Sequence, residues 1–171
     1  MGPGSVRRRG GPVEGDRRRS SEGVRRPSPG RDVTRTSYRL LPHTADLLVL
    51  VRAPDFPSLC AASVEAVFSL LTDRGKVRLP IRRTLRPAGG SPEDQLLSIL
   101  RQALLLFSLD RFLVRNAGAT MVGGAVEVAV RGEPMDPARH AIAREIKAVT
   151  AHGLAVGETG KGFTARFLLD V

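Results

Sequence analysis

The sequence has very little cysteine and no long apolar run, and both absences exclude classes of protein. Cys60 is the only cysteine among 171 residues, which excludes an internal disulfide framework and a thiolate-rich zinc site and suits a reducing cytoplasm. Its expected role is that of a small residue packed in the core. The longest apolar stretches, such as 47–51 and 103–107, fall far short of the roughly 20 residues that cross a bilayer. We therefore expect a soluble cytoplasmic protein, without a secretory signal because no apolar block follows the basic start.

Positive charge exceeds negative charge, mostly because of the first 37 residues. Lysine and arginine number 27 against 17 acidic residues, a formal net charge of +10. Residues 1–37 hold ten of the arginines in a background of Gly, Pro and Ser. Because this segment offers few side chains to bury, we predict a disordered basic tail. Its arginines could hold RNA phosphates weakly and without sequence readout, but a solvated tail with no fixed partner is the simpler interpretation.

After the tail, the pattern changes to strands and helices. The apolar run over 38–51 fits two short strands, or one strand with a kink at Pro42. Asp55 and Pro57 then mark the start of a helix. Apolar residues recur at three- and four-residue intervals in this helix until Thr72, so one of its faces is expected to be buried.

A second helix and a series of strands make up the rest of the chain. Ser91 and Pro92 start a helix that runs to about Leu109, and apolar residues nearly encircle it, as in a central core helix. Strands are expected over 76–85, 112–115, 121–131, 145–156 and 163–171, with turns at Gly118, Gly123–Gly124 and 157–162. The order predicts a single α+β domain over 38–171, with two helices packed on a largely antiparallel or mixed sheet.

Four polar clusters are not explained by the apolar patterning. They are residues 43–46, 132–140, 145–152 and the pair 170–171. The first three have ordinary local interpretations. The first suits a turn before a strand, and Asp136 and His140 suit a capped, solvated connection. In the third cluster, strand alternation puts Glu145 and Lys147 on one face, where they could form a surface ion pair of little worth, and His152 on the other face.

The last cluster suggests chemistry if the final strand pairs beside the strand that begins near Asp46. In that arrangement Asp46, Asp170 and the main-chain carboxylate of Val171 converge. Like charges held close repel unless a cation neutralises them. An all-oxygen set suits a hard ion such as Ca²⁺ or Mg²⁺ better than Zn²⁺. Spacing alone does not show the convergence.

Taken together and in order, these motifs resemble the archease family. The motifs that carry the resemblance are His43-Thr44-Ala45-Asp46, Leu70-Leu71-Thr72-Asp73, Gly132-Glu133 with Asp136 and Arg139-His140, the run from Glu145 to His152, and the final Leu169-Asp170-Val171. The similarity covers residues 38–171, and it implies a small α+β protein.

The resemblance also implies a function. Archeases are non-catalytic activators of the RtcB-type RNA ligase in tRNA splicing and RNA repair. They promote the GTP-dependent guanylylation of the ligase's histidine and so its multiple turnover, with GTP used by the ligase. By motif position, one divalent cation (Ca²⁺, or Mg²⁺ or Mn²⁺) would be held by Asp46, Asp170 and Val171. Further contacts to the ligase's nucleotide pocket would come from His43, His140, Glu145, Lys147 and His152. Neither a membrane nor DNA is an expected partner.

Some positions depart from the family pattern. Ala151 stands where an aromatic residue is common, the second helix has no tryptophan, and Asp94-Gln95 replaces a more acidic opening.

The three rival functions are a general chaperone-like binding module, a stand-alone RNA-binding protein that uses the tail, and a metal-dependent phosphohydrolase built on Asp46, Asp170 and His140. The sequence offers the phosphohydrolase no second metal-ligand cluster or activated nucleophile.

Overall fold

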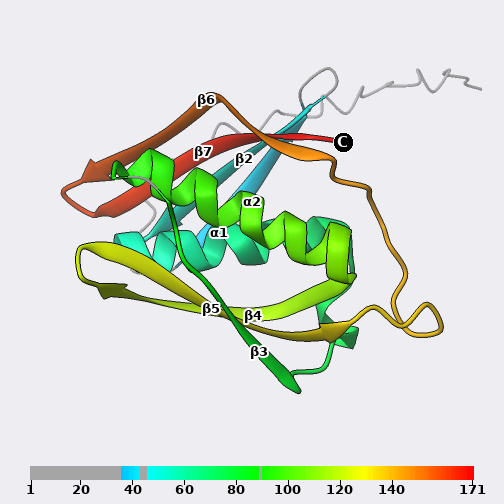
Figure 1. Cartoon of the computed structure of the whole chain (residues 1–171). Helices are drawn as coiled ribbons and strands as arrows, with labels where there is room; N and C mark the ends of the chain where they lie inside the picture. Colours follow the sequence, from blue (N-terminus) through cyan, green and yellow to red (C-terminus); the bar gives the residue numbers. More distant parts are fainter. Residues whose placement is uncertain (1–35, 43–45, 89) are drawn as a thin grey trace, which may run out of the picture. The chain divides into compact units, whose positions relative to one another are not determined.

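The computed structural model describes residues 36–42, 46–88 and 90–171. The elements, labelled in Figure 1, are β1 (Ser37–Pro42), β2 (Asp46–Ala53), α1 (Phe56–Leu71), a 3-10 turn (Arg74–Lys76), β3 (Ile81–Leu85), α2 (Pro92–Asp110), β4 (Phe112–Val122), β5 (Ala125–Pro134), β6 (Ala148–Thr159) and β7 (Gly162–Asp170). The predicted tail over 1–37 lies almost entirely outside the described residues, and so does His43. Within them, no helix combines the length and apolarity needed to span a membrane.

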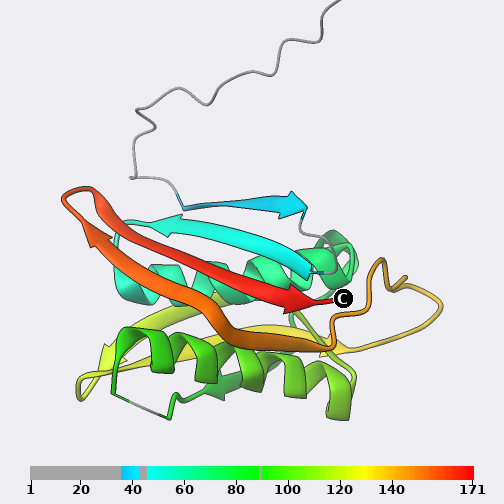
Figure 2. The same cartoon turned by 90° about the horizontal axis from the view of Figure 1, so that it is seen from above.

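The strands form two antiparallel sheets with both helices between them (Figures 1 and 2). The four-stranded sheet has the order β1-β2-β7-β6, and the three-stranded sheet has the order β3-β5-β4. Helix α1 contacts β2 and β7 of the first sheet and β4 and β5 of the second, and α2 also contacts both sheets. The predicted α+β class is confirmed. The expectation of one sheet is wrong, because helices with two apolar sides are covered on both sides.

Both helices begin at the residues that the sequence indicates. Asp55 precedes α1, and its Oδ1 accepts a 2.7 Å hydrogen bond from the main-chain N–H of Ser58. Ser91 precedes α2, and its Oγ accepts a 3.1 Å bond from the N–H of Asp94. Each cap satisfies an N–H that has no partner inside its helix. These local bonds explain why the helix starts are readable from sequence.

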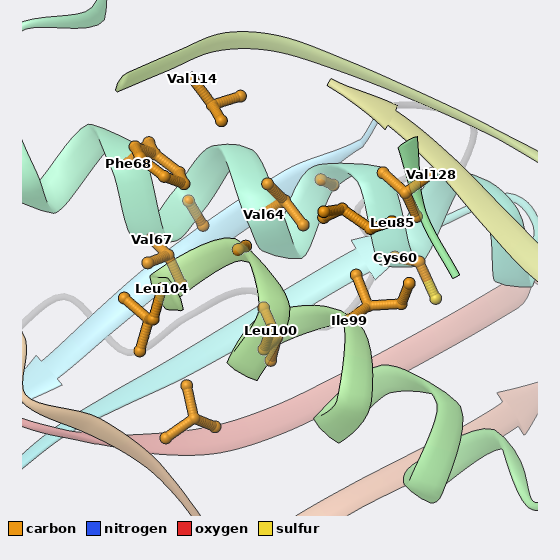
Figure 3. Close-up of a cluster of buried hydrophobic side chains, with 14 of the residues drawn as sticks. Cys60, Val64, Val67, Phe68, Leu85, Ile99, Leu100, Leu104, Val114 and Val128 are labelled. Carbon is orange, nitrogen blue, oxygen red and sulfur yellow. The ribbon is translucent and has the colours of Figure 1, made fainter. Parts of the chain in front are cut away.

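The helix at the centre of the core is α1 rather than α2. Phe68 and Cys60 of α1 are fully buried, and Figure 3 shows them among side chains from α2 and from the three-stranded sheet. Burial raises the pKa of the Cys60 thiol to about 12, in keeping with its predicted packing role. Helix α2 instead leaves Leu105 and Leu109 exposed, so the prediction that α2 is the central helix is wrong.

Two strands begin later than predicted. The strand predicted over 76–85 is only β3, after a 3-10 turn. The strand predicted from Glu145 begins at Ala148 as β6. The segment before it runs beside the end of α1, where the N–H of Ala143 donates a 2.8 Å hydrogen bond to the carbonyl of Leu71.

Gly118 does not form the turn expected there. It lies inside β4, opposite Ala129 of β5, and β4 continues to Val122. The turn between these strands is made by Gly123 and Gly124, whose φ angles are 57° and 83°. Since a two-residue hairpin turn needs positive φ at its centre, these two glycines meet the need and Gly118 is free to pair as a strand residue.

Candidate functional site

The pairing of β2 with β7 places Asp46 directly opposite Asp170. Residues 49, 51 and 53 of β2 and residues 165, 167 and 169 of β7 are buried toward the helices. The two aspartates belong to the alternate positions, so they lie on the outer face of the sheet. The strand pairing on which the predicted convergence depended is therefore present, at the edge where β7 ends (Figure 2).

The two carboxylates form an electrostatically unfavourable pair. Residues directly opposite on antiparallel strands have Cβ atoms about 4.5–5.5 Å apart, and like charges in that position are destabilising. The Asp170 side chain is 52% exposed, which lets water screen part of the repulsion. A nearby cation would offset this repulsion.

Lys147 lies beside Asp170, at the end of β7. Its main-chain N–H donates a 2.9 Å hydrogen bond to the carbonyl of Asp170, and this bond fixes the lysine next to the end of β7. Its Nζ donates to the main-chain oxygen of Val171 at 3.2 Å and lies 4.0 Å from Asp170 Oδ1. Because the lysine side chain is 57% exposed, this ion pair is weak and readily exchanged.

The donor set at this edge suits a hard cation with an open coordination sphere. Among the described residues, no group of three or more His, Cys, Asp and Glu side chains is placed to hold a metal. The oxygen donors here are the carboxylates of the opposed Asp46 and Asp170 and a main-chain oxygen of Val171, to which Lys147 donates. Oxygen-only ligands completed by water are typical of Ca²⁺ and Mg²⁺, so the residues present fit such an ion without enclosing it.

His140 lies apart from the aspartate pair, in a buried polar network. Its Nδ1 accepts a 3.0 Å hydrogen bond from the N–H of Asp136, so the ring hydrogen is on Nε2. Nε2 lies 3.3 Å from Glu133 Oε1 and 3.3 Å from the carbonyl of Lys76. The side chain is inaccessible to solvent, so His140 holds the connection after β5 in place.

Arg139 is the centre of the same network. Its guanidinium donates two 3.0 Å hydrogen bonds to Glu133 and one 2.7 Å bond to Asp136. The Arg139 bonds, together with the N–H of Arg78, lower the pKa of Glu133 from its usual 4.5 to about 2. Hydrogen bonds from Arg139 also lower the pKa of Asp136. The cluster at 132–140 is thus an ion-pair network that fixes the loop leading back to β6.

The other two predicted contact residues are exposed. Glu145 precedes β6, so strand alternation does not apply to it or to Lys147. His152 lies in β6 where the pairing with β7 shifts between Thr150 and Ala155, and its N–H donates to Thr150 Oγ1 at 3.1 Å. Of the predicted contacts, Lys147 joins the aspartate pair, and roles for Glu145 and His152 remain predictions.

Two helices between antiparallel sheets define a small α+β protein, in which Asp46 and Asp170 are paired where β7 ends. The family model for the archease protein family (MTH1598/TM1083) matches residues 38–171. The chain is 27% identical over 139 residues to protein archease of Methanosarcina acetivorans, covering 78% of this chain and 95% of that protein. It is 29% identical over 133 residues to protein archease of Methanopyrus kandleri, covering 75% and 95%.

A solved structure shares the fold. The solution structure of Methanobacterium thermoautotrophicum protein 1598 superposes with a TM-score of 0.66 at 18% identity, over 78% of this chain and 98% of that one. The chain belongs to the archease family, as its motifs indicated.

Proposed function

We propose that this chain activates an RtcB-type RNA ligase by promoting the GTP-dependent guanylylation of the ligase's histidine. The observation that carries the proposal is the opposition of Asp46 and Asp170 at an open sheet edge in a chain of the archease family. A site that offers two carboxylates and one lysine suits an accessory role at another protein's nucleotide pocket. Ligation in tRNA splicing or RNA repair would remain the ligase's own chemistry.

A divalent cation would be held by Asp46, Asp170 and the carboxylate of Val171. When bound, such an ion supplies positive charge that neutralises triphosphate oxygens, and phosphoryl transfer depends mainly on that and on placement. The chain's own residues orient the site. The Lys147 N–H holds the end of β7, and its ammonium is free to exchange between carboxylate and phosphate oxygens. His140 supports the neighbouring loop from inside the domain.

A phosphohydrolase is the less favoured function for the same residues. That reading requires His140 beside Asp46 and Asp170, whereas its side chain is fully buried against Glu133. The protein alone is therefore expected to leave nucleotides intact.

The test is a ligation assay with substoichiometric ligase, GTP and an RNA pair with 3′-phosphate and 5′-hydroxyl ends. Wild-type protein should raise both product per ligase and the ligase-bound GMP label. Asp46→Asn, which keeps the side-chain shape but removes the charge, should abolish the increase. Glu158→Gln is the matched control, because Glu158 is exposed on β6 at the other end of the same sheet. Equal stimulation by Asp46→Asn and wild type contradicts the proposal.

Cation binding is measured separately by thermal unfolding with Ca²⁺, Mg²⁺ or Mn²⁺. A ligand at a hundred times its dissociation constant stabilises the folded state by about 2.7 kcal/mol. We expect one of these ions to raise the unfolding temperature of wild type and Glu158→Gln but not that of Asp46→Asn. A shift of the same size in all three proteins would place the ion elsewhere.

A further inference from the structure

The outer face of the three-stranded sheet carries a basic hollow that the proposed function does not use. The hollow measures about 360 Å³, and its lining residues are Pro80, Arg82, Asn116, Gly118, Ala129 and Arg131. Gly118 and Ala129 lie opposite each other, so the floor has little side-chain bulk. The helices pack on the opposite face of this sheet (Figure 1).

Two arginines face each other across the hollow. Arg82 of β3 is directly opposite Arg131 of β5, and both are exposed. Like charges in this position cost stability. Within the described part of the chain, neither arginine has a carboxylate within ion-pair distance. By contrast, Arg83 of β3 pairs with Asp110 at 2.9 Å, and Arg86, just after β3, pairs with Glu127 at 2.8 Å. Among the described residues, Arg82 and Arg131 are therefore adjacent arginines without a carboxylate partner, next to two arginines that have one.

The hollow is also partly organised in advance. Arg131 Nη2 donates a 3.1 Å hydrogen bond to the carbonyl of Leu79, which restrains the side chain and leaves its other donors available. Arg74 bonds the carbonyl of Arg115 at the point where the pairing of β4 with β5 shifts by one residue, so Asn116 comes level with Arg131. A restrained guanidinium loses less freedom on binding and suits bidentate contact with phosphate.

We propose that this face binds the phosphate backbone of RNA. The choice of RNA rests on the proposed function, which places the protein beside an RNA ligase. The surface itself favours a polymer, because exposed Arg78, four residues before Arg82, extends the positive charge beyond the hollow. None of the described aromatic residues lines the hollow, so contact is with phosphates and not with stacked bases. Binding is therefore independent of sequence.

The experiment measures the salt dependence of RNA affinity for the full chain, by fluorescence anisotropy with labelled 20-nucleotide oligo(U) and oligo(A). In Arg82→Gln/Arg131→Gln, the slope of log affinity against log salt should fall by about 1.4, since each single-strand phosphate contact contributes about 0.7. The ratio of wild-type to variant RNA affinity should thus fall about sevenfold between 50 and 200 mM salt. Both RNAs should behave alike. The arginine-rich tail is present in every variant and cancels from the difference.

The charge-matched control is Arg101→Gln/Arg144→Gln. Both residues are exposed, and neither lines the hollow. Its slope should equal that of wild type. A second variant, Gly118→Val, keeps every charge and fills the floor, where an added Cβ meets nothing within 4 Å. It should weaken RNA binding about as much as loss of the two arginines.

Three outcomes overturn the inference. The first is an unchanged salt-dependence slope in Arg82→Gln/Arg131→Gln, and the second is an equal fall of the slope in the Arg101→Gln/Arg144→Gln control. The third comes from the same assay with phosphatidylserine vesicles in place of RNA: Arg82→Gln/Arg131→Gln loses affinity for the vesicles but not for RNA. The ligase is absent from this measurement, so the two proposals fail independently. If the RNA-binding test fails but Asp46→Asn still abolishes stimulation of the ligase, the proposed function stands. If Asp46→Asn leaves stimulation unchanged but the RNA-binding test succeeds, the RNA-binding face stands.

Discussion

Glu133 shows how one side chain ties several segments together. Its carboxylate accepts two hydrogen bonds from Arg139 and one, at 2.7 Å, from the N–H of Arg78, and it lies beside buried His140. These donors stabilise the ionised form, and so the pKa is lowered to about 2. A depressed carboxyl pKa means that the unfolded chain binds the extra proton first, so the stabilisation is present above pH 4.5 and is lost as the pH falls toward 2.

We therefore expect acid to destabilise wild type more than Glu133→Gln. Between pH 5 and pH 3 the free energy of unfolding of wild type should fall by about 2 kcal/mol more than that of the variant. At pH 7 the variant should be the less stable protein. Urea unfolding at pH 7, 5 and 3 measures both effects. Glu127→Gln is the control, because its partner Arg86 is largely solvent-exposed and the pH dependence should follow wild type.

At the scale of secondary structure, the close approach of β4 to β5 depends on Gly132. Gly132 pairs with Val114, and a Cβ built at residue 132 would collide with the main-chain carbonyl of Leu113. The approach occurs next to the point where the pairing of β4 and β5 shifts, just after Val114. A main-chain atom cannot rotate away, so the two strands would have to separate.

Gly132→Ala should lower the free energy of unfolding by about 3 kcal/mol, a large value for a single added methyl group. Gly118→Ala on β4 is the matched substitution, since nothing lies within 4 Å of its added Cβ. That variant should be within about 0.5 kcal/mol of wild type. Thermal and urea unfolding compare the two. Similar stabilities would show that β4 and β5 are not in close contact at residue 132.

At the scale of the whole described domain, α1 joins the two sheets into one core. It lies against β2 and β7 on one side and β4 and β5 on the other. Phe68 has no exposed surface and belongs to a cluster that includes Phe167 of one sheet and Val114 of the other. The sheets have no strand in common, so the helices carry the coupling between them.

Removing the Phe68 ring should destabilise both sheets together. Phe68→Ala is expected to cost about 3–5 kcal/mol, the range for a large aromatic side chain removed from a core. Hydrogen exchange should accelerate by similar factors at amides of β5 and β7. Leu109→Ala is the control, because this side chain is 76% exposed on α2 and its loss should change little. Faster exchange in one sheet alone would mean that the sheets unfold separately.

The sequence determined those features that depend on neighbours along the chain. The helix starts at Asp55 and Ser91 are local hydrogen bonds, and the buried alternation of Val126, Val128 and Val130 follows from the strand period of two. The archease motifs could also be recognised in their order along the sequence, and the family match confirms the family assignment. Cys60 is buried, as its position in an apolar helix indicated.

Only the tertiary structure decided which distant residues meet. The opposition of Asp46 and Asp170 depends on β7 pairing with β2, and that of Arg82 and Arg131 on β3 pairing with β5. Strand register is set by packing across the whole domain, so no local pattern contains it. The same holds for the burial of His140 and the division into two sheets, because both depend on which faces of α1 and α2 are covered.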